Sequence, residues 1–356
     1  MKDQQKLWQQ LQPQGLVSGQ YETPETLNSP WFVKVLLAFS GWFASILIFI
    51  FCLLALQDVI DNNIACAIIG SGFIILAYSL LKKTPNEFVE HLMLATSLAG
   101  QALIAWALFA NDALSSPLIS WFTLLILQGA LSVLMPHYVH RVCSALFASI
   151  ALIVCFHYLN ISLISSTVLL FLASFLILNE WRFNKLQPLL EAISYGIVLV
   201  IIPLQASTSL GYEISSWLNE HHEAGIINHY LEQALLILVM LYILLSILHR
   251  SDSIVPLSKR IALIVATICF CLLSMQASGI TVSLAILTLG FSYSNRILQG
   301  LGICSLLYYI SNYYYYLELT LLQKAASLCV VGLFLLLIRG LVLKFAQPKQ
   351  GAKNEA

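Results

Sequence analysis

Charge is scarce in this sequence. Only 10% of its 356 residues are Asp, Glu, Lys or Arg, and 59% are hydrophobic. A soluble globular chain carries about 25% charged residues, so this composition excludes an ordinary soluble domain. The formal net charge is zero and the basic residues are spread along the whole chain, which argues against a nucleic-acid partner. The lipid bilayer is the partner that such a composition predicts.

Patterns with recognisable chemistry are also missing. The sequence has no GxGxxG or P-loop pattern, no CxxC pair and no Ser/His/Asp or Cys/His arrangement. All eight cysteines lie inside apolar runs, where a thiol is usually a small buried hydrophobe, so we expect no disulfide framework. These absences favour a protein that has no cofactor and is not an enzyme.

Long apolar runs are what the sequence does contain. A membrane-spanning helix needs about 20 mostly apolar residues, and the runs predict an all-α, polytopic transmembrane helical bundle of about twelve spans. The predicted spans are Trp31–Leu56, Ile64–Leu81, Phe88–Ala110, Leu118–Met135, Val142–Leu159, Ile161–Asn179, Leu189–Ala206, Leu231–His249, Ile261–Gln276, Ile280–Ser294, Ile297–Tyr315 and Leu321–Arg339.

Lys and Arg alternate along the chain. Sixteen of the seventeen lie in every second gap between the apolar runs, for example Lys82, Arg141, Arg182 and Arg296, and the exception is Lys324. Short cytoplasmic loops retain basic residues, whereas short translocated loops mostly lack them. The alternation therefore predicts that both termini are cytoplasmic.

The domain organisation follows from this topology. Residues 1–30 and 344–356 are predicted to be cytoplasmic polar tails, and 31–343 the transmembrane helical domain. The links 276–280 and 294–297 are very short. They join separate spans or belong to one kinked or re-entrant segment.

Polar residues inside the spans are mostly neutral, and they are the candidates for a polar interior. Such side chains either bond across helices or line a path for a solute. Three glutamines inside the predicted spans are singled out: Gln101, Gln128 and Gln205. Glu90 and Glu191 lie just inside N-terminal helix ends, where the helix dipole favours an anion, so an interfacial structural role accounts for both.

One predicted outer loop, 207–230, is rich in histidine and glutamate. His221, His222 and His229 are candidate zinc ligands, since imidazole and carboxylate groups are what zinc prefers. The HExxH pattern fails, because no histidine stands three residues after Glu223. The segment is therefore interpreted as a solvated acidic loop, with a metal site as the alternative.

A run of tyrosines ends the eleventh predicted span. Tyrosine is enriched at the level of lipid headgroups, so the run predicts an aromatic belt, with a partner-binding surface as the alternative. The exceptional Lys324 lies close by, six residues after an acidic residue. The candidate functional surface is Tyr313, Tyr314, Tyr315, Glu318 and Lys324.

Small residues and one proline carry structural predictions. Gly70-Ser-Gly72 and Gly300-Leu-Gly302 lie inside spans and predict close contact between helices. Pro203 lies within the seventh predicted span, near its outer end, where it removes one helical hydrogen bond and permits a kink.

Both ends of the chain resemble a known family. The N-terminal stretches are Leu7-Trp-Gln-Gln-Leu-Gln-Pro-Gln-Gly-Leu-Val17 and Ser29-Pro-Trp-Phe-Val-Lys-Val-Leu-Leu37. The C-terminal stretches are Ser294-Asn-Arg-Ile-Leu-Gln-Gly-Leu-Gly302 and Tyr313-Tyr-Tyr-Tyr-Leu-Glu-Leu-Thr-Leu-Leu-Gln-Lys324. Together they resemble an uncharacterised bacterial multi-pass membrane family, domain of unknown function 4401. The serine that usually follows the last motif is Ala325 here.

The resemblance implies a location and a partner, but no catalytic residue. It implies the bacterial inner membrane and a small membrane protein with a GDYxxLxY motif. The sequence therefore favours a non-enzymatic membrane protein with an envelope role beside such a partner. The alternative is a transporter of an uncharged or lipidic substrate. An intramembrane enzyme, which would need Glu90, Glu191 or the histidines to converge, comes third. The oligomeric state stays open.

Overall fold

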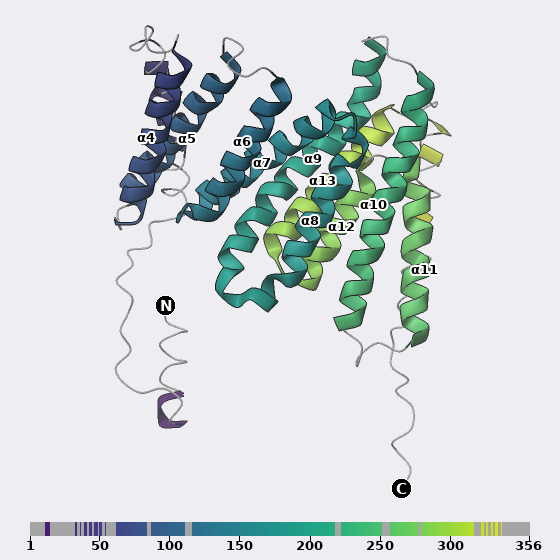
Figure 1. The fold of residues 1–356 in the computed structure, drawn as a ribbon. Coiled ribbons are helices and arrows are strands. Elements are labelled where there is room, and N and C mark those ends of the chain that lie inside the picture. The colour runs from purple at the N-terminus through teal and green to yellow at the C-terminus, as the bar shows by residue number, and fades with distance from the viewer. Residues whose placement is uncertain are drawn as a thin grey trace. The chain divides into compact units, whose positions relative to one another are not determined.

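The structure is a computed structural model. It describes residues 11–14, 62–83, 87–110, 116–217, 222–250, 257–276 and 279–316, and scattered positions between 33 and 54 and between 322 and 336. Throughout this described part the regular structure is helical and contains no strand (Figure 1). The chain divides into two compact units, Met1–Ala107 and Leu108–Ala356, and each is considered by itself.

Two apolar helices that contact each other through glycine form the described core of unit 1. They are α4 (Asn63–Leu81) and α5 (Glu87–Phe109), whose last two residues already count with unit 2, and a short turn, η1, covers Gln12–Gln14. The side chain of Asn62 accepts the backbone N–H groups of Ile64 and Ala65 and so caps α4, since the first N–H groups of a helix have no partner within it. A Cβ atom on Gly70 would lie 2.6 Å from the carbonyl oxygen of Gly100, so only glycine permits this approach.

Eight α-helices are described in unit 2. Three 3₁₀ turns lie between them: η3 (Ser162–Ile164), η4 (Glu180–Leu186) and η5 (Ser274–Gln276). The helices are α6 (Pro117–Leu134), α7 (Tyr138–Tyr158), α8 (Ser165–Asn179), α9 (Gln187–Trp217), α10 (His222–Arg250), α11 (Leu257–Leu273), α12 (Ile280–Ser292) and α13 (Arg296–Tyr316).

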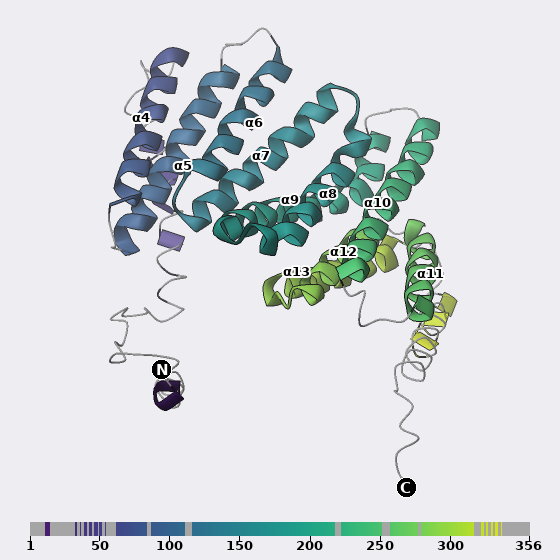
Figure 2. The same cartoon turned by 60° about the horizontal axis from the view of Figure 1, so that its bottom comes forward.

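The core of unit 2 lies among α8, α9, α10 and α12. Helix α9 packs against α7 and α8, α10 against α8 and α12, and α12 against α13 (Figures 1 and 2). Side chains at the centre are almost wholly buried, among them Leu170, Val198, Ile201, Ile243 and Ile286. Large apolar side chains on the outer faces stay exposed, for example Ile126 and Leu238, as expected of helices whose solvent is lipid.

Two of the very short links are tight turns between separate helices. After α7, Asn160 adopts a left-handed conformation (φ 57°), and the N–H of Ile161 donates to the carbonyl of Phe156 at 2.9 Å. After α12, Ser294 also adopts a left-handed conformation (φ 53°), and the N–H of Asn295 donates to the carbonyl of Gly290 at 2.9 Å. This is the Schellman ending of a helix, which satisfies its last carbonyl groups.

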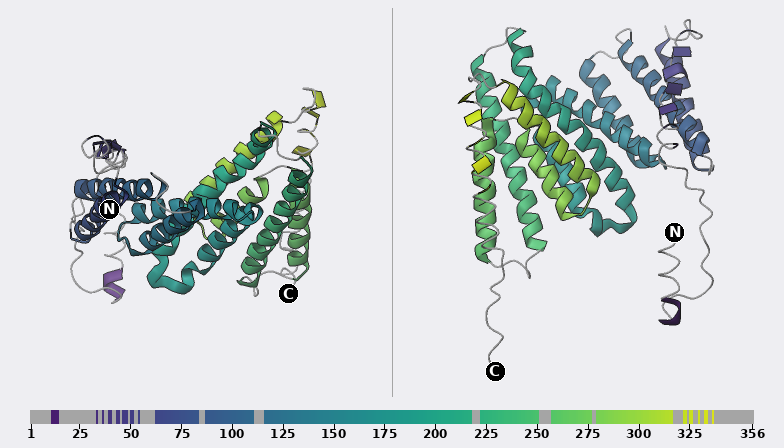
Figure 3. Two further views of the ribbon diagram at one scale, coloured as in Figure 1. Left: turned by 45° about the horizontal axis from the view of Figure 1, so that its top comes forward. Right: turned by 180° about the vertical axis from the view of Figure 1, so that it is seen from behind.

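Helices α12 and α13 are consequently an antiparallel pair and not one kinked segment. Residue numbers rise along one helix as they fall along the other: Gly290 lies against Gln299, Leu287 against Gly302, and Gly279 against Tyr309. The rear view shows the two helices side by side (Figure 3). Gly279, with a positive φ of 88°, directly precedes α12. Because α11 ends at Leu273 and η5 follows it, α11 and α12 are also separate helices.

Each predicted span from the second to the eleventh corresponds to a described helix. Seven described helices are long and apolar enough to cross a membrane, and they match the second to eighth predicted spans. Of the described helices that follow, α11 and α12 are shorter apolar helices and α13 has 21 residues. The first and last predicted spans lie outside the continuously described residues. The number twelve and the cytoplasmic position of the termini therefore stay predictions.

The interpretation of 207–230 as a loop is wrong. Helix α9 continues to Trp217 and α10 already begins at His222, so the backbone is helical over most of this segment. Extending an existing helix costs far less than starting a new one, so a polar sequence next to an apolar span readily continues the helix.

Each pair of small residues provides one close helix contact. Gly70 meets Gly100, whereas a Cβ atom on Gly72 would meet nothing within 4 Å. Gly302 meets Leu287, whereas Gly300 has open space. Residues two apart point about 200° apart on a helix, so only one of each pair can face the neighbouring helix.

We predict that Gly196 on α9 does not accept a side chain. A Cβ atom there would lie 2.6 Å from the carbonyl oxygen of Val142 and 2.7 Å from the Cβ of Ala145 on α7. Gly196→Ala should lower stability by about 1–3 kcal/mol, the usual cost of overpacking. The matched control is Gly129→Ala on α6, which meets nothing within 4 Å and gains about 1 kcal/mol of helix propensity. Thermal unfolding in detergent separates the two variants, and equal shifts would contradict the close contact.

Candidate functional site

Polar side chains in unit 2 gather at its two ends. The first end is where α8, α10 and α12 finish and where α7, α9 and α13 begin. The hydroxyl of Tyr195 lies 2.7 Å from Nδ2 of Asn295, which donates to it, and 2.9 Å from Oδ1 of the same side chain. Oδ1 of Asn295 also accepts the N–H groups of Ile297 and Leu298 and so caps α13. One asparagine thus joins α9 to α13 over a sequence separation of 100 residues.

Further bonds at this end connect α8, η4, α9 and α10. Tyr293 donates to the carbonyl of Leu178 at 2.8 Å and accepts a hydrogen bond from the guanidinium of Arg250. Gln187 donates to the carboxylate of Glu180 at 2.8 Å. Glu191 interacts with the Tyr195 hydroxyl. We call this set the tyrosine network; its members are Glu180, Gln187, Glu191, Tyr195, Arg250, Tyr293 and Asn295.

The tyrosine network joins segments that the alternation of basic residues places on one side of the membrane. Arg141, Arg182, Arg250 and Arg296 all belong to the links that end here. The geometry therefore agrees with the predicted alternation across unit 2, and the side on which this end lies stays a prediction. Glu191 was singled out from the sequence, but Tyr195 and Asn295 were not, because no local pattern signals a contact across 100 residues.

Buried polar residues also gather at the opposite end of unit 2. They come from the start of α8, the region of α9 that follows Pro203, the first apolar turns of α10, η5 and the start of α12. We call this set the polar layer; its members are Ser165, Ser166, Gln205, Gln233, Ser274, Thr281 and Ser283, all of them buried.

Hydrogen bonds tie these segments to one another. Nε2 of Gln205 donates to the carboxylate of Glu232 at 2.9 Å, which connects α9 to α10. Nε2 of His229 lies 3.1 Å from the carbonyl oxygen of Met275, which connects α10 to η5. The hydroxyls of Ser274 and Thr281 lie 3.0 Å apart, which connects η5 to α12.

Gln233 is the unusual member of the polar layer. Its side chain is 1% exposed, and within the described part of the chain neither its amide oxygen nor its amide nitrogen has a hydrogen-bond partner. The hydroxyl of Ser165 is in the same condition. Leaving a buried polar group unpaired costs roughly 1–3 kcal/mol, so such groups are rare in the cores of folded proteins. The sequence did not single out Gln233, since Glu232-Gln233 follows a polar segment and resembles a helix entry.

The three glutamines predicted to form a polar interior are all buried. Gln101 lies on α5 in unit 1, while Gln128 on α6 and Gln205 on α9 belong to unit 2. Of the three, Gln205 is the one in the polar layer.

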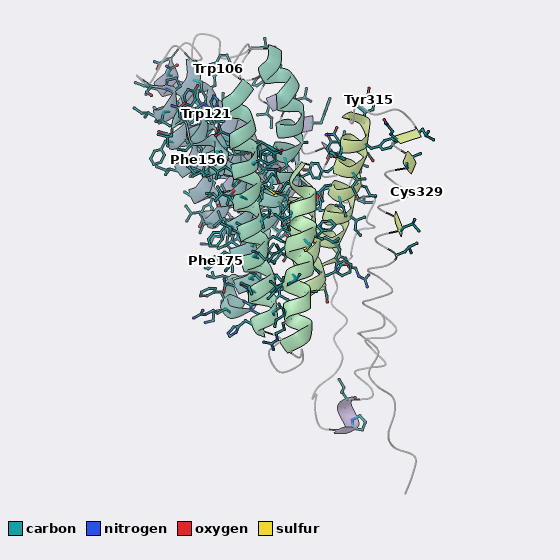
Figure 4. All side chains as sticks on the ribbon, turned by 90° about the vertical axis from the view of Figure 1, so that its right-hand side faces the viewer. Trp106, Trp121, Phe156, Phe175, Tyr315 and Cys329 are labelled. Atoms are coloured by element: carbon teal, nitrogen blue, oxygen red, sulfur yellow. The ribbon has the colours of Figure 1, made fainter. Side chains whose placement is uncertain are left out.

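The tyrosines of α13 have two different environments. Tyr309 is 1% exposed and donates to the carbonyl of Ile202 at 2.5 Å, so it is a core residue that fastens α13 to α9. Tyr315 is 78% exposed at the end of α13 and projects from it (Figure 4). Tyr313 is exposed and Tyr314 half-buried, whereas Glu318 and Lys324 lie outside the described residues.

Two of the other candidates from the sequence do not come together: Glu191 and His229 lie at opposite ends of unit 2. Glu90 belongs to unit 1. Among the described residues no group of three or more His, Cys, Asp or Glu is arranged to hold a metal ion. The side chains of His221 and His222 lie outside those residues, so a zinc site there stays a prediction.

These observations define the class of protein: a polytopic, all-helical protein with seven described helices capable of crossing a membrane. The family is shown by the sequence itself. A family model with the description "Domain of unknown function (DUF4401)" matches residues 30–345, so the chain belongs to this family, and the predicted resemblance is confirmed. Neither the curated proteins nor the solved structures contain a match.

We predict that the contact between Tyr195 and Asn295 stabilises unit 2. Tyr195→Phe removes the hydroxyl that contacts Asn295 and Glu191 and should cost about 1–2 kcal/mol. Asn295→Ala also removes the cap of α13, which adds about 1 kcal/mol. The double variant should lose less than the sum of the two, by about 0.5–3 kcal/mol, because the residues interact directly. Tyr158→Phe, at a half-exposed phenol of α7, is the matched control. Strict additivity in thermal unfolding would contradict the direct contact.

Proposed function

We propose that this protein is a non-enzymatic carrier of a small, uncharged, polar solute in the bacterial inner membrane. The polar layer carries the proposal, and within it the buried Gln233, whose amide atoms have no partner among the described residues. In a membrane bundle whose buried residues serve only helix packing, apolar groups or paired polar groups would be buried at this position. Unpaired groups are expected where a ligand supplies the missing partners.

The scarcity of charge favours a neutral solute. Ion- and proton-coupled carriers place ionisable residues deep in their spans, where they are costly and serve the transported charge. The described polar layer contains hydroxyl and carboxamide groups, and the nearby carboxylate of Glu232 is half-buried and bonded to Gln205. Hydroxyls and amides exchange hydrogen bonds with a neutral solute and provide nothing to balance a net charge.

The arrangement of unit 2 suits alternating access to such a site. The tyrosine network joins the helices at one end, and the polar layer lies near the other end. Pro203 lies inside α9, two residues before Gln205. A proline removes one helical hydrogen bond, so the last part of α9 can bend relative to the rest. Bending there would open the polar layer while the tyrosine network stays closed.

An envelope role beside a small GDYxxLxY-type membrane protein is the function that the sequence favours. That role rests on the family resemblance and is compatible with a carrier, because a small partner can accompany a transporter. It stays a prediction from the sequence, whereas the contacts of unit 2 favour the carrier.

Solute uptake into vesicles tests the proposal. The full chain is purified and reconstituted into phosphatidylethanolamine and phosphatidylglycerol vesicles, and uptake of radiolabelled uracil, xylitol and glutamate is compared with empty vesicles. We expect uracil or xylitol to enter about tenfold faster than into empty vesicles, which corresponds to about 1.4 kcal/mol in the barrier. Glutamate, which is charged, should enter these vesicles no faster than it enters empty vesicles. If neither neutral solute enters faster, the carrier function is wrong for this class of solutes.

A further inference from the structure

We propose that Gln233 binds the solute through two parallel hydrogen bonds, and that the solute therefore presents a donor and an acceptor side by side. This inference rests on the proposed carrier function and specifies its substrate class. Uncharged amides, lactams and imides have this arrangement, and so do neighbouring hydroxyl groups of a polyol.

The two glutamines of the polar layer differ in what they do. Nε2 of Gln205 donates to Glu232 at 2.9 Å and joins α9 to α10. Gln233 stands next to Glu232 on α10, is buried, and has no partner for either amide atom in the described part of the protein. Gln205 thus has a structural bond, and Gln233 is the carboxamide with its hydrogen-bonding capacity unused.

The chemistry of a carboxamide sets the substrate class. Its oxygen accepts and its NH₂ group donates in one plane, which is why a glutamine can pair with the adjacent donor and acceptor of a nucleobase. The group is neutral, so it gives no advantage to an ion. A solute with only acceptors, or only donors, would leave one half of the amide unpaired and bind more weakly.

The helix face that carries Gln233 is otherwise apolar over the next turn. Three and four residues further along α10 are Leu236 and Ile237, both buried, and positions at this spacing share a helix face. The unpaired hydroxyl of Ser165 belongs to α8, which packs against α10. A small molecule with one polar edge and one apolar face, such as a pyrimidine, fits this combination better than a fully polar one.

Gln233→Leu gives the sharpest test, because stability and transport should change in opposite directions. Leucine has nearly the same size and removes the unpaired amide, so the variant should unfold at a higher temperature. Uptake of the neutral solute should fall about ten- to a hundredfold, the discrimination usual for a lost bidentate pair. Gln299→Leu is the matched control. Its amide donates to the carbonyl of Gly290 at 3.1 Å, so that variant should unfold at a lower temperature and keep its uptake.

Competition distinguishes the two sources of the donor and acceptor pair. Unlabelled uracil should inhibit the uptake of the radiolabelled neutral solutes if the substrate is an imide. 1,3-Dimethyluracil lacks the N–H donors and should not inhibit this uptake. Inhibition by xylitol alone would assign the pair to hydroxyl groups.

Each remaining outcome decides the inference. If wild-type protein transports and Gln233→Leu transports equally well, Gln233 is not the binding residue, and the carrier function stands. If Gln233→Leu unfolds at a lower temperature, its amide is bonded within the protein, and the inference is wrong. Absence of uracil and xylitol uptake by the wild-type protein would instead refute the carrier function for this class of solutes.

Discussion

A hydrocarbon solvent provides no hydrogen bonds, and this constraint governs the rest of the structure. Every backbone N–H and C=O within the bilayer must be paired inside the chain, which permits helices and little else. Polar side chains follow the same rule. Many serines and threonines in the described spans donate back to a carbonyl of their own helix, as Ser149 and Ser174 do. Side chains that bond between helices gather at the ends of unit 2, in the tyrosine network and near the polar layer. The hydroxyl of Ser165 departs from this rule, and Gln233 departs from it with both atoms of its amide.

The same constraint explains how the helices contact one another. Apolar side chains gain little by leaving lipid for a neighbouring helix, so association depends on close packing. Glycine provides it at several places, for example where Gly70 meets Gly100, Gly196 meets α7, and Gly302 meets α12. The short links satisfy their own backbone through left-handed residues at Asn160 and Ser294, which allows antiparallel neighbours with no loop.

Features that depend on local composition, such as the positions of the helices, could be predicted from the sequence. Contacts between residues far apart in the sequence could not. Hydropathy located the helices from α4 to α13, and alternation of basic residues predicted which helix ends share a side. Gln205 lies in an apolar run of the sequence, which predicted that its side chain is buried, and it is buried. The bond between Tyr195 and Asn295 could not be predicted, since a single sequence holds no information about pairs 100 residues apart. Residues 207–230 were misread because polar composition resembles a loop, although helices extend beyond the membrane at little cost.

The central claim is that the two polar ends of unit 2 face opposite sides of the membrane, and maleimide labelling tests it most directly. Single cysteines are introduced into a cysteine-free background by Ser162→Cys in η3 and Arg182→Cys in η4, both exposed positions. Spheroplasts are treated with a membrane-impermeant maleimide. Ser162→Cys should be labelled at once, and Arg182→Cys only after the membrane is permeabilised. The reverse order would leave the two ends on opposite sides and overturn only the predicted cytoplasmic position of the termini. Labelling of both variants in intact spheroplasts, or of both only after permeabilisation, would contradict the claim.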